Sequence, residues 1–153
     1  MRAFGIIGYP LGHSFSPDYF SEKFKRENSE AASYEAFPLD DIAHFPMLIT
    51  QQVTLRGLNV TIPYKKSIIP YLNSLDPLAA KLNSVNTIKI ENGEMIGYNT
   101  DVEGFVKSIK PLLHNKIKKA LVLGSGGSAQ SVKEGLRQIG IEFGVVSRNI
   151  NSG

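Results

Sequence analysis

Cysteine is absent from this 153-residue chain, which excludes disulfide bonds and thiolate metal sites. No apolar run approaches the roughly 18 residues that a membrane-spanning helix requires. The first residues lack a basic segment followed by a long apolar stretch, so we expect no signal peptide. The three histidines lie far apart in the sequence, without the spacing of metal ligands. These absences favour a cytoplasmic protein that carries no metal.

The overall composition is that of a globular chain, with 42% hydrophobic and 20% charged residues. The length suits one ordinary domain, or one small domain with part of another. The net charge of +3 is small and the basic pairs are scattered along the chain. We therefore expect neither a nucleic-acid partner nor a membrane partner.

A short apolar run at residues 58–62 predicts a buried strand that stops before Pro63, which cannot donate a hydrogen bond to a neighbouring strand. Asn59 and Thr61 are two residues apart and should point to the same face of this strand. Lys65 follows the strand end, where ligands bind in open α/β sheets. A solvated surface lysine is the simpler alternative, because lysines are mostly exposed.

Two serine hydroxyls follow the first predicted strand, which covers residues 3–8. Ser16 followed by Pro17 indicates the start of a helix, with Ser16 as its N-cap. Ser14 and Ser16 would then lie at a helix N-terminus, where anions are favoured. The alternative is that Ser16 caps the helix and does nothing else.

Residues 87–98 predict a β-hairpin around an Asn-Gly pair, which is the signature of a type I′ turn. Pairing of the two strands should bring Asn86 close to Asp101, although they are distant in sequence. Thr100 should cap the following helix at residues 102–110. A carboxylate in the first turn of that helix has an alternative role, because it stabilises the helix dipole.

Three further elements are predicted in the first part of the chain. Residues 34–39 have the composition of a strand. Asp40 or Asp41 should cap a short helix that ends near residue 49. Asp76 followed by Pro77 indicates a helix that runs to about residue 82.

Residues 119–147 predict a strand, a helix and a second strand, with a glycine-rich first turn. The spacing G-x-G-G-x-A is a variant of the dinucleotide fingerprint, and it occurs in the strand-to-helix context that this fingerprint requires. Glycines at this place let the backbone approach a pyrophosphate at the helix N-terminus. A tight turn without a ligand is the alternative. The loop residues are Gly124, Ser125, Gly126, Gly127, Ser128 and Ala129.

The residues after the second strand indicate which dinucleotide this loop would bind. An NAD site would place an acid about 20 residues beyond the glycines. Ser147, Arg148 and Asn149 stand there instead, offering a guanidinium and no carboxylate, so NADP is expected. The further strands of a doubly wound domain do not follow. We therefore expect this region either to self-associate through its open edge or to be loosely ordered.

Taken in order, these segments resemble the shikimate dehydrogenase family. The matching segments are GYPLGHSFSP at 8–17, NVTIPYK at 59–65, VNT at 85–87, NTD at 99–101, GSGGSA at 124–129 and SR at 147–148. The resemblance spans the whole chain, but only somewhat over the N-terminal half of the family's length. It implies an α/β fold, with a shikimate-binding catalytic domain at residues 1–103 and an incomplete Rossmann NADP-binding domain at 104–153.

The resemblance also implies an activity and roles for individual residues. The family oxidises the C3 hydroxyl of shikimate to the ketone of 3-dehydroshikimate and passes a hydride to NADP, in aromatic amino acid biosynthesis. The implied catalytic pair is Lys65 and Asp101, and which of the two takes the proton stays open. The implied substrate-binding residues are Ser14 and Ser16 at the carboxylate, and Thr61, Asn86 and Asp101 at the hydroxyls.

Several positions depart from the family's pattern. Val102 stands where a glycine is usual, and Ser147 and Asn149 replace an asparagine and a threonine. Ser152 stands where a second basic residue often binds the 2′-phosphate, which weakens the case for tight NADP binding. A glutamine from the family's C-terminal helices has no counterpart, so we expect no turnover by these 153 residues alone.

Three competing functions are compatible with the same residues. A quinate/shikimate dehydrogenase of wider specificity would share the same motifs. A fragment could bind the substrate without turning it over. A basic nucleic-acid-binding module is the third alternative. It would require that the resemblance of all these motifs to the family is a coincidence.

Overall fold

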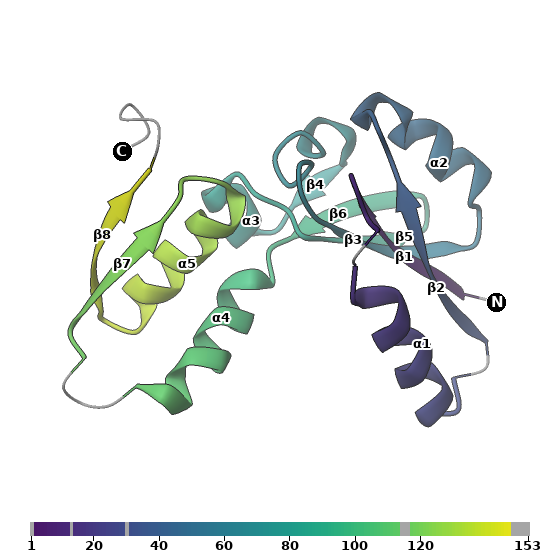
Figure 1. The fold of residues 1–153 in the computed structure, drawn as a ribbon. Coiled ribbons are helices and arrows are strands. Elements are labelled where there is room, and N and C mark those ends of the chain that lie inside the picture. The colour runs from purple at the N-terminus through teal and green to yellow at the C-terminus, as the bar shows by residue number, and fades with distance from the viewer. Residues whose placement is uncertain (1, 13, 30, 114–116, 148–153) are drawn as a thin grey trace.

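The chain folds into two lobes joined near the middle of Figure 1, in the computed structural model that describes residues 2–12, 14–29, 31–113 and 117–147. The first lobe contains a six-stranded sheet, and the second contains a two-stranded sheet with its own helices. The predicted α/β class is therefore confirmed. None of the helices within these described ranges is long and apolar enough to cross a membrane.

The strands are β1 (Arg2–Gly8), β2 (Ala32–Pro38), β3 (Leu55–Val60), β4 (Ser74–Leu75), β5 (Thr87–Glu91), β6 (Glu94–Tyr98), β7 (Lys119–Leu123) and β8 (Glu142–Val146). The α-helices are α1 (Ser16–Arg26), α2 (Phe45–Gln51), α3 (Pro77–Leu82), α4 (Asp101–Ile109) and α5 (Gly127–Gln138). Short 3₁₀ turns cover Ile42–His44, Ile69–Tyr71 and Lys110–Leu112.

The large sheet has the order β2-β1-β3-β5-β6-β4 and is mixed. β1 runs parallel to β2 and β3, whereas β5 runs antiparallel to β3 and β6. Helices α1 and α2 lie on opposite sides of this sheet in Figure 1. On the α2 side, Ile7, Leu58 and Ile88 are at most 2% exposed and pack with Phe45 into the first core.

The α1 side of the sheet carries polar groups among its aromatic rings. Strand register places Tyr34 beside Phe4, and Asn59 beside Thr87, on this same face. Phe20 of α1 stacks on the ring of Tyr34, with ring centroids 4.5 Å apart. This face therefore combines an apolar helix contact with a row of groups that can form hydrogen bonds.

Most local signals in the sequence are confirmed. Asn92 and Gly93 have φ values of 54° and 82°, as a type I′ turn requires, and β5 pairs with β6 as predicted. The Asp76 side chain accepts a hydrogen bond from the backbone N–H of Ala79 at 2.7 Å and so caps α3. Asp41 caps its helical turn through the backbone N–H of Ala43, at 2.9 Å.

Two predicted caps are wrong. Helix α1 begins at Ser16 itself, with Phe15 in the N-cap position and no side-chain cap. Thr100 occupies the N-cap position of α4 without a side-chain cap, and its hydroxyl accepts from the Asn86 amide at 2.9 Å. The Ser16 hydroxyl lies beside Tyr34 of β2, so both hydroxyls face residues distant in the sequence instead of capping their helices.

The second lobe is a strand–helix–strand unit, as predicted, in which β7 and β8 pair in parallel. Its small core contains Val122, Leu136 and Ile141. Helix α4 packs on α5 at Gly135, where a Cβ atom would come within 2.6 Å of the Phe105 ring. The domain boundary expected after residue 103 falls inside α4, and it stays a prediction.

Glu134 of α5 forms an ion pair with Lys81 of α3. Its carboxylate is 7% exposed and accepts a hydrogen bond from Lys81 Nζ at 2.7 Å. That bond is the main cause that lowers the pKa of Glu134 below its ordinary value of 4.5. The ion pair therefore stabilises the fold above pH 4.5, and this contribution is lost as the pH falls through the lowered pKa.

We expect Glu134→Gln to lower the free energy of unfolding at neutral pH by about 1–2 kcal/mol, because a charged hydrogen bond becomes a neutral one. Urea unfolding at several pH values measures this difference, which should disappear in acid. A difference that persists unchanged at pH 3 would contradict the assigned cause.

Candidate functional site

The candidate residues lie just beyond the ends of the central strands of the large sheet, at the C-terminal end of β3. Lys65 follows the C-terminal end of β3, and Asp101 begins α4 directly after β6. Asn86 precedes β5, which runs antiparallel to β3, so the start of β5 lies at the end of β3. Strand direction therefore brings together three side chains that are far apart in sequence.

Lys65 and Asp101 form a close ion pair. Lys65 Nζ lies 2.6 Å from Asp101 Oδ2, and the two side chains are 14% and 29% exposed. The other carboxylate oxygen accepts from Asn86 Nδ2 at 2.7 Å. The closeness of Asn86 to Asp101 predicted from the hairpin is thus confirmed. A charged pair fixed in this way can exchange a proton with a hydroxyl group brought beside it.

Asn86 is held on several sides. Its Oδ1 accepts from the backbone N–H of Thr100 at 2.9 Å and from the Thr87 hydroxyl at 3.2 Å. Its Nδ2 also donates to the Thr100 hydroxyl at 2.9 Å. These bonds determine which end of the amide faces Asp101.

Ser14, Ser16 and Thr61 line one hollow of about 580 Å³, together with the loop that follows β1. β3 ends at Val60, before the predicted residue 62, but the backbone N–H of Thr61 still donates to the Ile7 carbonyl at 2.9 Å. Gly8 allows this approach, because a Cβ atom there would lie 2.4 Å from the Thr61 methyl group. Two hydroxyls from the loop and helix thus share a hollow with one from the end of β3.

The glycine-rich loop lines a second hollow, of about 490 Å³, which also contains Lys65. Gly124 has a φ of 112°, which side chains rarely allow, and Gly126 is the N-cap of α5. The loop therefore presents bare backbone at a helix N-terminus, an arrangement that fits a pyrophosphate. Residues of the loop that line this hollow are Gly124, Gly126, Gly127, Ser128 and Ala129.

The loop directly contacts the first lobe. A Cβ atom on Gly127 would lie 3.0 Å from Ser84 Oγ and 3.4 Å from Lys65 Cβ, and Lys65 Nζ is 3.4 Å from Ser128 Oγ. Ile62 lines both hollows, so they adjoin at this residue. The serine hollow, the ion pair and the glycine loop form one continuous region.

The remaining cofactor predictions concern the end of β8. The hydroxyls of Ser125 and Ser147 lie 3.1 Å apart, so the glycine loop meets the residue after β8. Arg148, predicted to bind the 2′-phosphate of NADP, lies outside the described residues. Among the residues that the structure does describe, no group of three His, Asp or Glu side chains could hold a metal ion.

Sequence reasoning missed Tyr34, which connects to this site through Asn59. Tyr34 is 8% exposed, and its hydroxyl donates to Asn59 Oδ1 at 2.7 Å. A buried tyrosine hydroxyl usually has a hydrogen-bond partner. The position of Tyr34 between the polar residues Ser33 and Glu35 could have indicated its burial, but its partner lies on β3 and could not be read from the sequence.

Comparison with known proteins supports the same region. Residues 6–88 match the family model of the shikimate dehydrogenase substrate binding domain. The chain is 36% identical to the NADP(+) shikimate dehydrogenase of Bacillus cereus strain G9842, over 98% of this chain and 55% of that protein. It thus spans about half the length of the curated relatives it matches.

Solved structures agree with this match. The crystal structure of shikimate dehydrogenase from Aquifex aeolicus has a TM-score of 0.90 at 35% identity, over 99% of this chain and 57% of that one. The Thermus thermophilus enzyme, solved in complex with NADP(H) and shikimate, has a TM-score of 0.87 at 32% identity. That match covers 97% of this chain and 57% of the Thermus chain.

Proposed function

The chain belongs to the shikimate dehydrogenase family, and from this membership we propose that it binds shikimate and supplies the catalytic pair for its NADP-dependent, reversible conversion to 3-dehydroshikimate. The observation that carries the proposal is the Lys65–Asp101 ion pair, of which Lys65 lines the hollow of the glycine loop, next to the serine hollow. Residues 1–103 would be the shikimate-binding catalytic domain, and 104–153 the start of the NADP-binding domain.

The two sides of the site suit the two ends of the substrate. Ser14 and Ser16 donate hydroxyl hydrogens to the shikimate carboxylate from the loop and the start of α1. Thr61 and Asn86, on the strand ends, bind the ring hydroxyls. The hydroxyl at C3 would then lie against Lys65 and Asp101.

Oxidation removes a proton and a hydride from the substrate. The Lys65–Asp101 pair takes the proton from the C3 hydroxyl as one coupled unit, while Asn86 keeps the carboxylate oriented. NADP⁺, when bound, would supply the hydride acceptor for C3, and loss of this hydride would leave the ketone. The glycine loop would hold the cofactor's pyrophosphate, with Ser125 and Ser147 beside it.

The test is NADPH formation from shikimate. It should be assayed in the 153-residue chain and in an extended protein, in which the chain is fused to the part of the Aquifex aeolicus enzyme that the match does not cover. We expect shikimate binding by the chain in calorimetry and turnover by the extended protein. Binding without turnover in either form would leave only a substrate-binding role. The absence of both binding and turnover would refute the proposed function.

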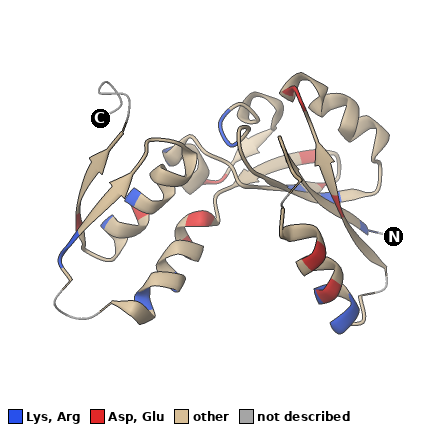
Figure 2. Ribbon diagram, in the orientation of Figure 1, with Lys and Arg blue, Asp and Glu red and all other residues tan. Residues whose placement is uncertain are grey.

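The same preparations distinguish a broader dehydrogenase and a nucleic-acid-binding module from the proposed enzyme. Equal turnover of quinate and shikimate would indicate the broader dehydrogenase. Figure 2 shows acidic and basic residues interspersed on both lobes, so the charge distribution gives no support to a nucleic-acid-binding module. A salt-dependent shift with random DNA would be the signature of such a module.

Cofactor preference should depend on Arg148. Arg148→Ala in the extended protein should weaken NADP binding about tenfold or more, because the 2′-phosphate loses a charged partner, while NAD binding changes little. Titration of both cofactors measures this. An equal loss for NADP and NAD would remove the argument for NADP preference.

Two further expectations belong to this proposal. We propose a cytoplasmic location, supported by the lack of cysteine. Leu121 and Leu123 on β7, and Val146 on β8, are more than half exposed. This open apolar face supports self-association through the second lobe, which stays a prediction.

A further inference from the structure

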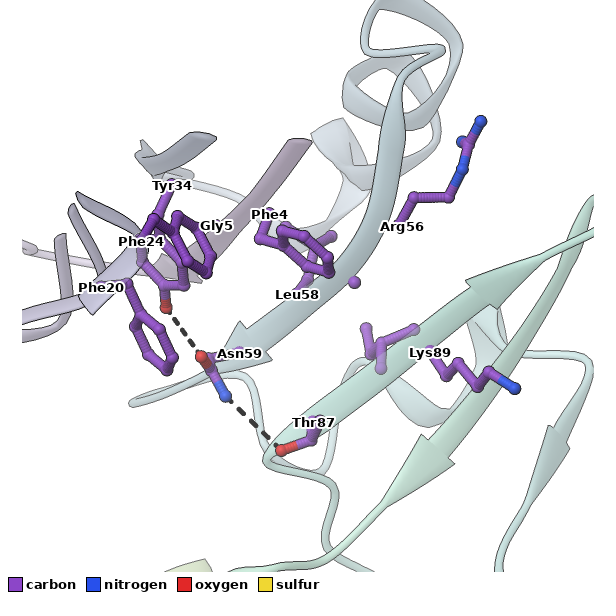
Figure 3. Close-up of a pocket in the computed structure, with 12 residues that line it drawn as sticks. Phe4, Gly5, Phe20, Phe24, Tyr34, Arg56, Leu58, Asn59, Thr87 and Lys89 are labelled. Atoms are coloured by element: carbon purple, nitrogen blue, oxygen red, sulfur yellow. Dashed lines mark hydrogen bonds between the residues drawn. The ribbon is translucent and has the colours of Figure 1, made fainter. Parts of the chain in front are cut away.

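Three polar side chains from three strands form a row behind the candidate site, as Figure 3 shows. The Tyr34 hydroxyl donates to Asn59 Oδ1 at 2.7 Å, and Asn59 Nδ2 lies 3.5 Å from Thr87 Oγ1. The row lies in a hollow of about 350 Å³ whose other walls include Phe4, Phe20 and Phe24. Such surroundings strengthen hydrogen bonds between the polar groups and penalise any group left unpaired.

The hydrogen bonds in this row all run in one direction. A phenol has one hydrogen, and Tyr34 gives it to Asn59 Oδ1. Asn59 then presents its amide nitrogen to Thr87, whose own hydrogen goes to Asn86 Oδ1 at 3.2 Å.

The row continues into the ion pair. Because Asn86 Oδ1 is occupied by donors, its Nδ2 faces Asp101 and donates at 2.7 Å. If the Asn59 amide were reversed, its oxygen would face Thr87 and draw the Thr87 hydrogen away from Asn86. The orientation of Asn59 therefore bears on how firmly Asn86 is held against Asp101.

We propose that Tyr34 is a positioning residue, whose hydroxyl fixes the Asn59 amide and, through Thr87, keeps Asn86 oriented toward Asp101. The consequence for substrate rests on the proposed function of shikimate binding. Burial raises the pKa of Tyr34 to about 12, although the nearby Ser16 hydroxyl opposes this. The hydroxyl thus keeps its hydrogen at the pH of any ordinary assay.

The first test needs no substrate. In the 153-residue chain, NMR should show the Asn59 and Asn86 side-chain amides well ordered on the nanosecond timescale. Tyr34→Phe keeps the stacked ring and removes only the hydroxyl, and it should make the Asn59 amide mobile. Tyr71→Phe is the matched control, because its ring packs against Phe45 on the other face of the sheet. Unchanged order of Asn59 in a folded Tyr34→Phe chain would overturn the proposal.

The second test uses shikimate binding and a double variant. Tyr34→Phe and Thr87→Val should each weaken binding, by up to about tenfold, the effect of one net hydrogen bond. Because both act through the same row, the double variant should bind no more weakly than the poorer single variant. Losses that multiply would show that the two residues act independently, and so overturn the proposed coupling. If the unaltered chain does not bind shikimate, the proposed function fails, whereas the amide-order test still decides the role of Tyr34.

Discussion

Lys65→Ala should lower kcat for shikimate oxidation in the extended protein by a factor of about 10²–10⁴, the usual contribution of a general acid–base group. KM should change far less, because Ser14, Ser16 and Thr61, the proposed substrate-binding residues, line the adjoining hollow, which the substitution leaves unchanged. The structure gives the reason for the large effect. Lys65 Nζ forms hydrogen bonds with both Asp101 and Ser128, so it lies where the ion pair meets the glycine-rich loop.

Lys107→Ala is the matched control for this prediction. Lys107 forms an ion pair of the same 2.6 Å length with Glu103, also on α4, but both side chains are more than two-thirds exposed. An exposed ion pair contributes little to stability, so its loss should leave the activity at the level of the unaltered protein. A Lys65→Ala protein with near-normal kcat and a greatly raised KM would make Lys65 a binding residue only.

Asp101→Asn should also lower kcat, by about 10²–10³, because removal of the charge leaves the coupled pair unable to take the proton. The shape of the side chain and one acceptor oxygen are kept, so the fold should survive. The double variant Lys65→Ala/Asp101→Asn should then be little slower than the worse single variant, because residues that act as a unit are not additive.

Steady-state kinetics of the four proteins tests this coupling. Rate losses that multiply in the double variant would show that Lys65 and Asp101 act in separate steps. Activity in Asp101→Glu, but not in Asp101→Asn, would show that the reaction needs the negative charge of this side chain and not only its hydrogen bonding.

The sequence predicted those parts of the fold that depend on local rules. The Asn92–Gly93 turn requires positive φ, which Asn and Gly adopt readily, so the sequence predicted the hairpin at this point. Pairing of its two strands in turn predicted that Asn86 lies beside Asp101. Asp76 caps a helix because its partner, the backbone N–H of Ala79, is three residues away. In these cases donor and acceptor are close in the chain, so pattern and spacing are sufficient.

The parts that the sequence could not predict depend on partners from distant segments. Ser16 and Thr100 each had a plausible local role as a cap, but the Ser16 hydroxyl lies beside Tyr34 of β2 and the Thr100 hydroxyl bonds to Asn86. The row of Tyr34, Asn59 and Thr87 could not be predicted for the same reason. Strand order and register must be known before these three residues can be placed together. The family resemblance pointed to the proposed catalytic pair, Lys65 and Asp101, but not to Tyr34, which we propose as a positioning residue.

The close approach at Gly127 limits which residues this position can hold. A Cβ atom there would lie 3.0 Å from Ser84 Oγ and 3.4 Å from Lys65 Cβ, the first of which is closer than ordinary van der Waals contact, so the neighbouring side chains would have to shift to admit it. Lys65 is held by hydrogen bonds to Asp101 and Ser128, so a shift of its side chain would disturb the ion pair. Any side chain larger than hydrogen at position 127 would therefore act on the Lys65–Asp101 pair from the other lobe.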